Sequence, residues 1–164
     1  MIETGVLKFE YSHGRSDTDD LLNINNKFMT CSPKCPRMLS SEKLLFLVII
    51  DEYNKKSSPK IIGRANTYGF VDTNIATQNM INKYSGLSHY KYYVELYNVE
   101  VIDKVIKDCI PLYDIIAQFQ HSMFPHTTAK NPYRAYAQQS YRLISNSARD
   151  YINQLLNAEK LIKL

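Results

Sequence analysis

The amino-acid sequence predicts a single α+β domain. Three patterns support this class: a strand-like alternation near the N-terminus, an unbroken apolar run at residues 44–50, and apolar residues at helical spacing in the last third. A chain of 164 residues is long enough to bury one core. Because no internal repeat or low-complexity linker divides it, we expect residues 1–164 to form one unit.

The first predicted element is a half-buried strand at residues 7–11. Apolar residues alternate there with Lys8 and Glu10, which is the two-residue period of a strand with one wet side. Ser16 then precedes several acidic residues, a pattern typical of an N-cap followed by the first turn of a short helix.

Three further strands are predicted in the middle of the chain. The apolar run 44–50 is typical of a central buried strand, and the polar stretch 52–59 of a turn or hairpin loop. Residues 60–71 and 91–101 indicate two more strands, the second with interleaved apolar and polar positions.

Two helices are predicted towards the C-terminus. Pro111 suits the first position of a helix over residues 111–119, because that position needs no backbone N–H. Either Ser145 or Ser147 caps the last helix. Its apolar residues recur at helical spacing: Ala148, Tyr151, Ile152, Leu155 and Leu156.

Charge and composition exclude some classes of protein. No apolar run reaches the roughly 18 residues of a membrane span, no signal peptide is visible, and three cysteines suit a reducing compartment, so we expect a cytoplasmic protein. The basic excess lies after residue 118, where six Lys and Arg residues face two acidic ones. Such a cluster is compatible with a nucleic-acid partner, but also with an ordinary solvated face.

The closely spaced Cys31 and Cys35 raise three alternatives: a metal site, a redox pair or the rim of a pocket. The chain has no second tight pair of ligands for zinc, and Pro33 and Pro36 exclude the helix N-terminus that lowers a redox thiol pKa. We therefore expect no metal and no cofactor. A proline-stiffened loop that carries binding groups is the favoured interpretation.

The chain lacks the common hydrolase and nucleotide-binding motifs, so no catalytic residue is predicted. Its thirteen tyrosines, with no tryptophan, are the better lead. Aromatic rings fill cores first, but a few around a pocket would stack on a flat base.

Five segments, 11–38, 44–51, 60–72, 82–103 and 138–156, resemble in order and spacing the YTH and EVE domains of the PUA-like superfamily. They include FMTCSPKCPRM, IIGRA and QQSYRLISNSARDYINQLL. The resemblance implies an open mixed β-barrel of five to six strands, flanked by short helices, with a pocket for a modified base flipped out of nucleic acid.

The resemblance also implies a set of pocket residues. Tyr11 and Ser12 end the first strand at the pocket, Phe28 or Thr30 takes the place of the first cage tryptophan, and Cys31 and Ser32 follow it. Tyr84 matches the later cage aromatic. Because the chain has no tryptophan, phenylalanine and tyrosine must supply the π faces.

Physical chemistry adds further candidates to such a site. Tyr68 and Phe70 are candidates for stacking, and the Asn66 amide for reading a polar base edge. Phosphate contacts are expected from five basic residues: Arg37, Arg64, Lys130, Arg134 and Arg142.

The expected function is therefore recognition of a modified base, with DNA favoured over RNA. The chain could be the specificity domain of a modification-dependent restriction system, fused to or associated with a nuclease or NTPase, and would not itself catalyse. One alternative is a small ASCH-like enzyme that acts on a modified nucleoside, for which Lys8, Thr30 and Glu95 are conceivable. Another is a protein-interaction module of a phage or defence system with a tyrosine-rich surface.

Overall fold

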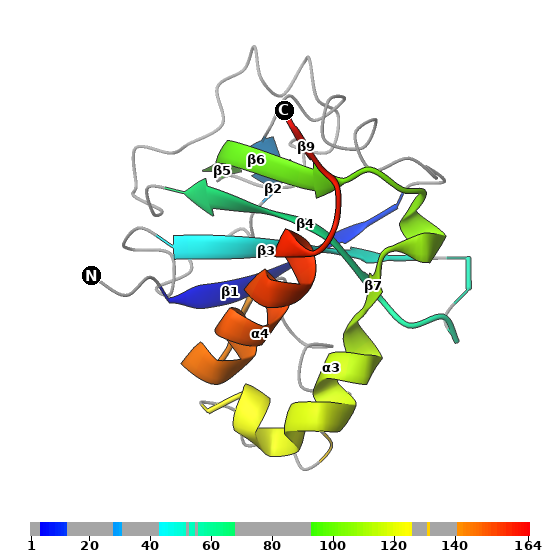
Figure 1. Ribbon diagram of the computed structural model, residues 1–164, viewed down its shortest axis with the longest axis vertical. Coiled ribbons are helices and arrows are strands. Elements are labelled where there is room, and N and C mark those ends of the chain that lie inside the picture. Colours follow the sequence, from blue (N-terminus) through cyan, green and yellow to red (C-terminus); the bar gives the residue numbers. More distant parts are fainter. Residues whose placement is uncertain are drawn as a thin grey trace.

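The computed structural model describes residues 4–12, 28–30, 43–51, 53–54, 56–67, 93–125, 131 and 141–164, with the backbone alone at 11, 28–30 and 93–95. A mixed seven-stranded sheet forms the centre, and helices α3 (Leu112–Phe119) and α4 (Asn146–Asn157) lie over one of its faces (Figure 1). The strands are β1 (Gly5–Tyr11), β3 (Lys43–Ile50), β4 (Lys60–Thr67), β6 (Tyr97–Ile102), β7 (Ile110–Pro111), β8 (Tyr141–Leu143) and β9 (Leu161–Lys163). A separate two-stranded sheet pairs β2 (Phe28–Thr30) with β5 (Tyr93–Glu95).

The large sheet has the order β8-β1-β3-β4-β6-β9, with β7 also paired to β4. β1 and β3 are parallel, and every other pair is antiparallel. Seven strands exceed the five to six expected, because β7, β8 and β9 are only two or three residues long and carry no complete alternation. Among the described residues no pairing joins the outer strands β8 and β9, so this sheet is open.

Two irregularities bend the sheet where its central strands meet. Arg64 faces Glu100 and Asn66 faces Tyr97, so β6 carries one extra residue opposite Ala65. Asn98 takes up that excess with φ 52°, a left-handed conformation that asparagine tolerates better than most residues. The register between β3 and β4 also shifts once. Such bulges bend a strand and increase its local twist.

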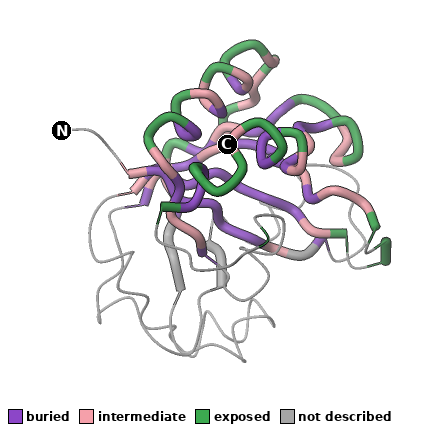
Figure 2. The backbone as a smooth tube through the Cα atoms, turned by 90° about the horizontal axis from the view of Figure 1, so that it is seen from below, coloured by how far each residue is buried: buried purple, intermediate pink, exposed green. Residues whose placement is uncertain are grey.

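Both predicted helices are present. Ser145, not Ser147, caps α4: its hydroxyl accepts a hydrogen bond from the Ala148 N–H at 3.2 Å. Pro111 precedes α3 as its N-cap and does not occupy the first helical position. The two helices bury apolar residues against the sheet: Leu112, Ile115, Ile116, Ala148, Ile152 and Leu156. Their buried sides and exposed backs are visible in Figure 2.

The first strand is buried on both faces, which corrects the half-buried strand predicted from its alternation. Lys8 is only 1% exposed. Its ammonium donates to the Phe9 carbonyl oxygen at 2.8 Å, pairs with Glu10 at 3.2 Å and lies 4.8 Å from the ring centre of Tyr141. These partners offset part of the desolvation of the buried charge. The alternation failed as a guide because the polar position Lys8 is covered as well, by the ring of Tyr141 on β8, a distant residue that no local pattern reveals.

The other predicted strands are present with different limits. The described part of the 60–71 segment is strand from Lys60 to Thr67, and the 91–101 segment divides into β5 and β6. The short helix expected after Ser16 lies outside the described residues.

Gly63 marks the closest approach of β4 to β6. A Cβ atom at this position would overlap the backbone carbonyl oxygen of Glu100 and lie 2.9 Å from the Cα of Val101. The clash is with backbone, so no side-chain rotation can relieve it. This contact explains a glycine within an otherwise strand-forming segment.

We expect Gly63→Ala to lower the free energy of unfolding by about 1 to 3 kcal/mol, because β4 and β6 must separate. Chemical denaturation followed by circular dichroism measures this. Gly5→Ala is the matched control, since a Cβ there meets only the side chains of Arg149 and Ile144 at 3.1–3.2 Å and should lower it less. Equal losses in the two variants would contradict the backbone explanation.

Candidate functional site

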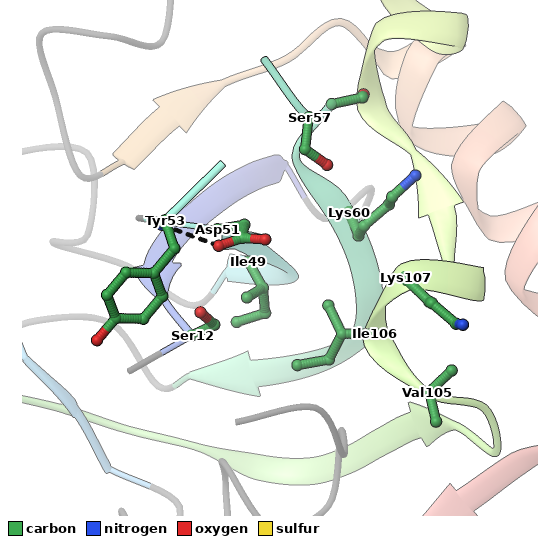
Figure 3. Close-up of a pocket in the computed structure, with 10 residues that line it drawn as sticks. Ser12, Ile49, Asp51, Tyr53, Ser57, Lys60, Val105, Ile106 and Lys107 are labelled. Carbon is green, nitrogen blue, oxygen red and sulfur yellow. Dashed lines mark hydrogen bonds between the residues drawn. The ribbon is translucent and has the colours of Figure 1, made fainter. Parts of the chain in front are cut away.

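A hollow of about 510 Å³ opens at one edge of the large sheet (Figure 3). It lies where β1 and β3 end, β4 begins and the chain leaves β6. Its lining residues come from these four places: Ser12, Ile49, Asp51, Tyr53, Ser57, Ser58, Lys60, Val105, Ile106 and Lys107. Its volume falls within the roughly 300 to 1,000 Å³ of typical ligand pockets.

The sheet topology brings these residues together. Because β1 and β3 are parallel, their C-terminal ends lie at the same edge, and the N–H of Ser12 donates to the carbonyl oxygen of Ile50 at 3.0 Å. β4 is antiparallel to β3, so it starts at that edge. β6 is antiparallel to β4 and ends there, so the 3₁₀ turn η3 (Ile106–Asp108) follows beside the hollow.

The hollow combines an apolar part with a polar rim. Ile49, Val105 and Ile106 provide the apolar surface. Lys60 and Lys107 contribute two ammonium groups from β4 and η3, and their side chains point away from each other in Figure 3. This is the general composition of a ligand site, in which a few polar groups orient a ligand held by apolar contact.

Tyr53 stands at the rim on the turn between β3 and β4. It is 82% exposed, and among the described residues it is the one large hydrophobic side chain with high exposure. Its backbone N–H donates to Asp51 Oδ1 at 2.9 Å, a local bond that shapes the turn. An exposed ring held by an ordered turn beside a hollow is suited to stacking on a flat ligand.

Ser58 connects this turn to helix α3. Its hydroxyl accepts a hydrogen bond from the Tyr113 N–H at 3.1 Å, and the carbonyl oxygen of the neighbouring Pro59 accepts one from the Leu112 N–H at 2.8 Å. These bonds satisfy two N–H groups of the first turn of α3, which lack partners within the helix. The Ser58 side of the hollow is therefore anchored to the core.

Of the predicted pocket residues, Ser12 lines the hollow and Asn66 does not. The Cα partner of Tyr11 in β3 is Ile50, whereas that of Asn66 is Leu44 at the other end of the same strand. Six residues of strand span about 20 Å. Asn66 instead lines a second, smaller hollow of about 360 Å³ between β4, β6 and β9. The structure thus does not bring Ser12 and Asn66 together.

The backbone of Phe28 and Thr30 lies in β2, paired with Glu95 and Tyr93 of β5. Tyr11 is the last residue of β1, next to Ser12. Most of the other predicted site residues lie outside the described part of the chain: Cys31, Ser32, Arg37, Tyr68, Phe70, Tyr84, Lys130 and Arg134.

Arg64 fastens α4 to the sheet. Its Nε lies 3.3 Å from Glu100 Oε1 on β6, and its two terminal nitrogens donate to the side-chain oxygens of Asn153 and Asn157 at 2.9 and 2.7 Å. All three guanidinium nitrogens thus have protein acceptors. A phosphate contact by Arg64 would compete with these hydrogen bonds to Glu100, Asn153 and Asn157.

Arg142 differs from Arg64 in its surroundings. It lies on the outer strand β8, and its buried Nε has no hydrogen-bond partner among the residues that the structure describes. Partial burial lowers the pKa of its guanidinium from the usual value. Because this Nε is buried, an anion bound by Arg142 would have to contact the terminal guanidinium nitrogens.

The described residues include neither a metal-binding cluster nor a reactive thiol. Over the described ranges, no group of three or more His, Cys, Asp and Glu side chains could hold a metal ion. Cys109 is 4% exposed and its thiol lies 3.5 Å from the carbonyl oxygen of Val105. Burial raises the pKa of this thiol to about 11, which makes it a poor nucleophile. None of the described helices has the length and apolar character needed to cross a membrane.

Of the ten residues that line the hollow, sequence reasoning predicted Ser12 and missed nine, among them Asp51, Tyr53, Lys60 and Lys107. Asp51 and Tyr53 belong to a stretch that has the composition of an ordinary turn, and Lys60 opens a strand. The available signal was an aromatic residue in a polar turn directly after a buried strand, since such a ring has no core to join. Lys107 carried no signal, because only the β4–β6 pairing brings η3 to this edge.

Two solved structures match this chain over nearly its whole length, although few of the aligned residues are identical. The structure of human THYN1 protein in complex with 5-methylcytosine-containing DNA matches with a TM-score of 0.53 and 12% identity, over 96% of this chain and 100% of that chain. The structure of a hypothetical protein from Leishmania major matches with a TM-score of 0.53 and 13% identity, over 95% and 96%. No protein-family model and no curated protein matches the sequence. The chain has a PUA-like fold of the EVE type.

We expect Arg64→Ala to lower the free energy of unfolding by about 1 to 3 kcal/mol, because Glu100 and two asparagines lose a charged hydrogen-bond partner. Arg142→Ala, which removes no side-chain hydrogen bond within the described part of the chain, should unfold at nearly the wild-type denaturant concentration. Denaturant titrations of the two variants test this. If Arg64→Ala unfolds normally but weakens the salt dependence of nucleic-acid binding, fastening α4 to the sheet is not the main role of Arg64.

Proposed function

We propose that this protein is a nucleic-acid-binding module that accepts a modified base in the hollow at the end of β1. The observation that carries the proposal is the composition of the hollow: an apolar surface, the exposed ring of Tyr53 and two lysines at one sheet edge. The fold it shares with THYN1, whose structure contains 5-methylcytosine DNA, supports the same class of ligand.

The energetics of base extrusion decide what the hollow must provide. Flipping a base out of a duplex costs a few kcal/mol of lost stacking and pairing. Stacking on one aromatic side chain returns about 1 to 3 kcal/mol, which Tyr53 can supply. Contact with Ile49, Val105 and Ile106 adds apolar burial, where a methyl group on the base would be favourable.

The charged rim fits the backbone of the same nucleic acid. Lys60 and Lys107 are placed to contact the phosphates that flank an extruded base, which adds affinity without base preference. We propose further phosphate contacts from Arg142 and from Arg37, Lys130 and Arg134. Phe28, Tyr68, Phe70 and Tyr84 remain candidates for further stacking on the base, and Cys31 and Ser32 for contacts with it. Asn66 is left out because it lies at the other end of the sheet, and Arg64 because its guanidinium nitrogens already bond to protein acceptors.

In the cell, such a module would act as the recognition arm of a larger system. We favour DNA as the nucleic acid, and restriction of modified DNA, with an associated nuclease or NTPase, as the process. The ASCH-like enzyme alternative gains no support from Lys8, whose buried ammonium does not line the hollow. The protein-interaction alternative gains none from a tyrosine surface, because Tyr53 alone is highly exposed among the described residues.

The proposal is tested with a panel of otherwise identical duplexes that carry one methylated, hydroxymethylated, glucosylated or plain base. We expect one modified duplex to bind more tightly than the plain duplex. Duplexes that all bind equally, or none that bind, would refute modified-base recognition.

We expect Tyr53→Ala to weaken binding of the preferred duplex by about 1 to 3 kcal/mol, because one stacking face is lost. The melting temperature should not change, since the ring is largely in solvent. Tyr151→Ala is the contrasting control: its ring packs edge-on against Phe119 in the helix layer, with ring centres 5.5 Å apart. That variant should lose stability and keep its affinity while folded.

We expect Lys60→Gln and Lys107→Gln each to reduce the slope of log affinity against log salt by about 1. Plain and modified duplexes should weaken alike, because phosphate contacts carry no base information. Lys163→Gln, on β9 away from this hollow, is the matched control and should leave the slope unchanged. Slopes that stay at the wild-type value in both hollow variants would place the phosphate contacts elsewhere.

A further inference from the structure

We infer that Asp51 makes the hollow selective for a base that carries an exocyclic amino group, as cytosine and adenine do. The inference rests on the proposed function and narrows it. Bases that present a carbonyl oxygen at the same position, such as thymine, uracil and hypoxanthine, would be disfavoured.

Asp51 follows β3 directly, and its carboxylate lies beside Ile49 and Ser12 in the hollow (Figure 3). Its Oδ1 accepts the Tyr53 N–H at 2.9 Å. Among the described residues, the Asp51 side chain makes this one hydrogen bond. Its Oδ2 can therefore accept a hydrogen bond from a ligand. One oxygen therefore shapes the turn, and the other can bind a ligand.

An ionised carboxylate can accept hydrogen bonds but cannot donate them. An amino group on a base edge donates, and carboxylates accept from the amino group of cytosine in known base readout. A carbonyl oxygen at that position would face Asp51 with two acceptors and no proton between them. The hollow thus opposes keto bases as well as favouring amino bases.

The same charge decides how a nucleotide would be oriented. A phosphate beside Asp51 would meet like charge, whereas Lys60 and Lys107 offer opposite charge. The base is therefore expected against Asp51 and the phosphates against the lysines. Because Tyr53 and Asp51 belong to one hydrogen-bonded turn, stacking on the ring would bring a base edge near the carboxylate.

The test uses two duplexes that differ in one base, 5-methylcytosine or thymine, placed opposite an abasic site so that neither has a pairing partner. The two bases share the ring and the methyl group but differ in the amino or carbonyl group and in the protonation of the adjacent ring nitrogen. Wild-type protein should bind the 5-methylcytosine duplex at least about fivefold more tightly, the low end for a base-edge contact. Adenine and hypoxanthine form a second pair for the same comparison.

Asp51→Asn then separates recognition from turn formation. The amide oxygen can still accept the Tyr53 N–H, but the second position becomes an N–H donor. The preference for the amino base should fall to none or reverse, with an unchanged melting temperature. Asp103→Asn is the matched control, because that carboxylate pairs with Lys160 and does not line this hollow.

The outcomes of these measurements distinguish the role of Asp51 from the proposed binding of a modified base. If wild-type protein binds both duplexes equally, or if Asp51→Asn keeps the wild-type preference, Asp51 only shapes the turn and the inference is wrong, while modified-base binding stands. If wild-type protein binds no duplex of the panel, the proposed function fails and the inference with it. The inference is supported if Asp51→Asn loses the preference for the amino base and Asp103→Asn keeps it.

Discussion

The parallel pairing of β1 with β3 is the constraint on which the candidate site depends. It places the C-terminal ends of two neighbouring buried strands at one edge, and the antiparallel strands β4 and β6 add a strand start and a strand end there. The residues that directly follow a strand are no longer paired with a neighbouring strand. Their side chains can therefore face a ligand, while the sheet holds their position. Ser12 and Asp51 occupy such positions, which are held by the rigid sheet.

The face with α3 and α4 has a different role from this edge. Arg64 links β4 and β6 to α4 through three side-chain partners, and Ser58 and Pro59 fix the start of α3 to the β3–β4 turn. The helices thus stabilise the scaffold that carries the hollow. Charge alone therefore does not make a basic residue near the sheet a phosphate ligand, because neighbouring side-chain acceptors can use the same nitrogens.

Fold and site were predictable to different degrees. The strands at 44–50 and 60–67 and the helix that Ser145 caps could be predicted, because their apolar spacing and capping are local properties. The burial of the Lys8 side chain could not be predicted, since it depends on β8 and on the ring of Tyr141, more than 100 residues away along the chain. Tyr53 and Lys107 could not be grouped either, because only the strand pairing brings them to one hollow.

The sequence by itself determined the α+β class and the order of the strands and helices that the structure describes, since periodicity and capping act over a few residues. Its resemblance to the PUA-like superfamily led to the EVE-type fold that the solved structures match. The tertiary structure alone decided that Tyr53 and Lys107 line one hollow, that Asn66 lies at the other end of the sheet and that Arg64 bonds to Glu100 and two asparagines. These outcomes depend on strand register and on contacts between distant residues, for which local pattern carries no information.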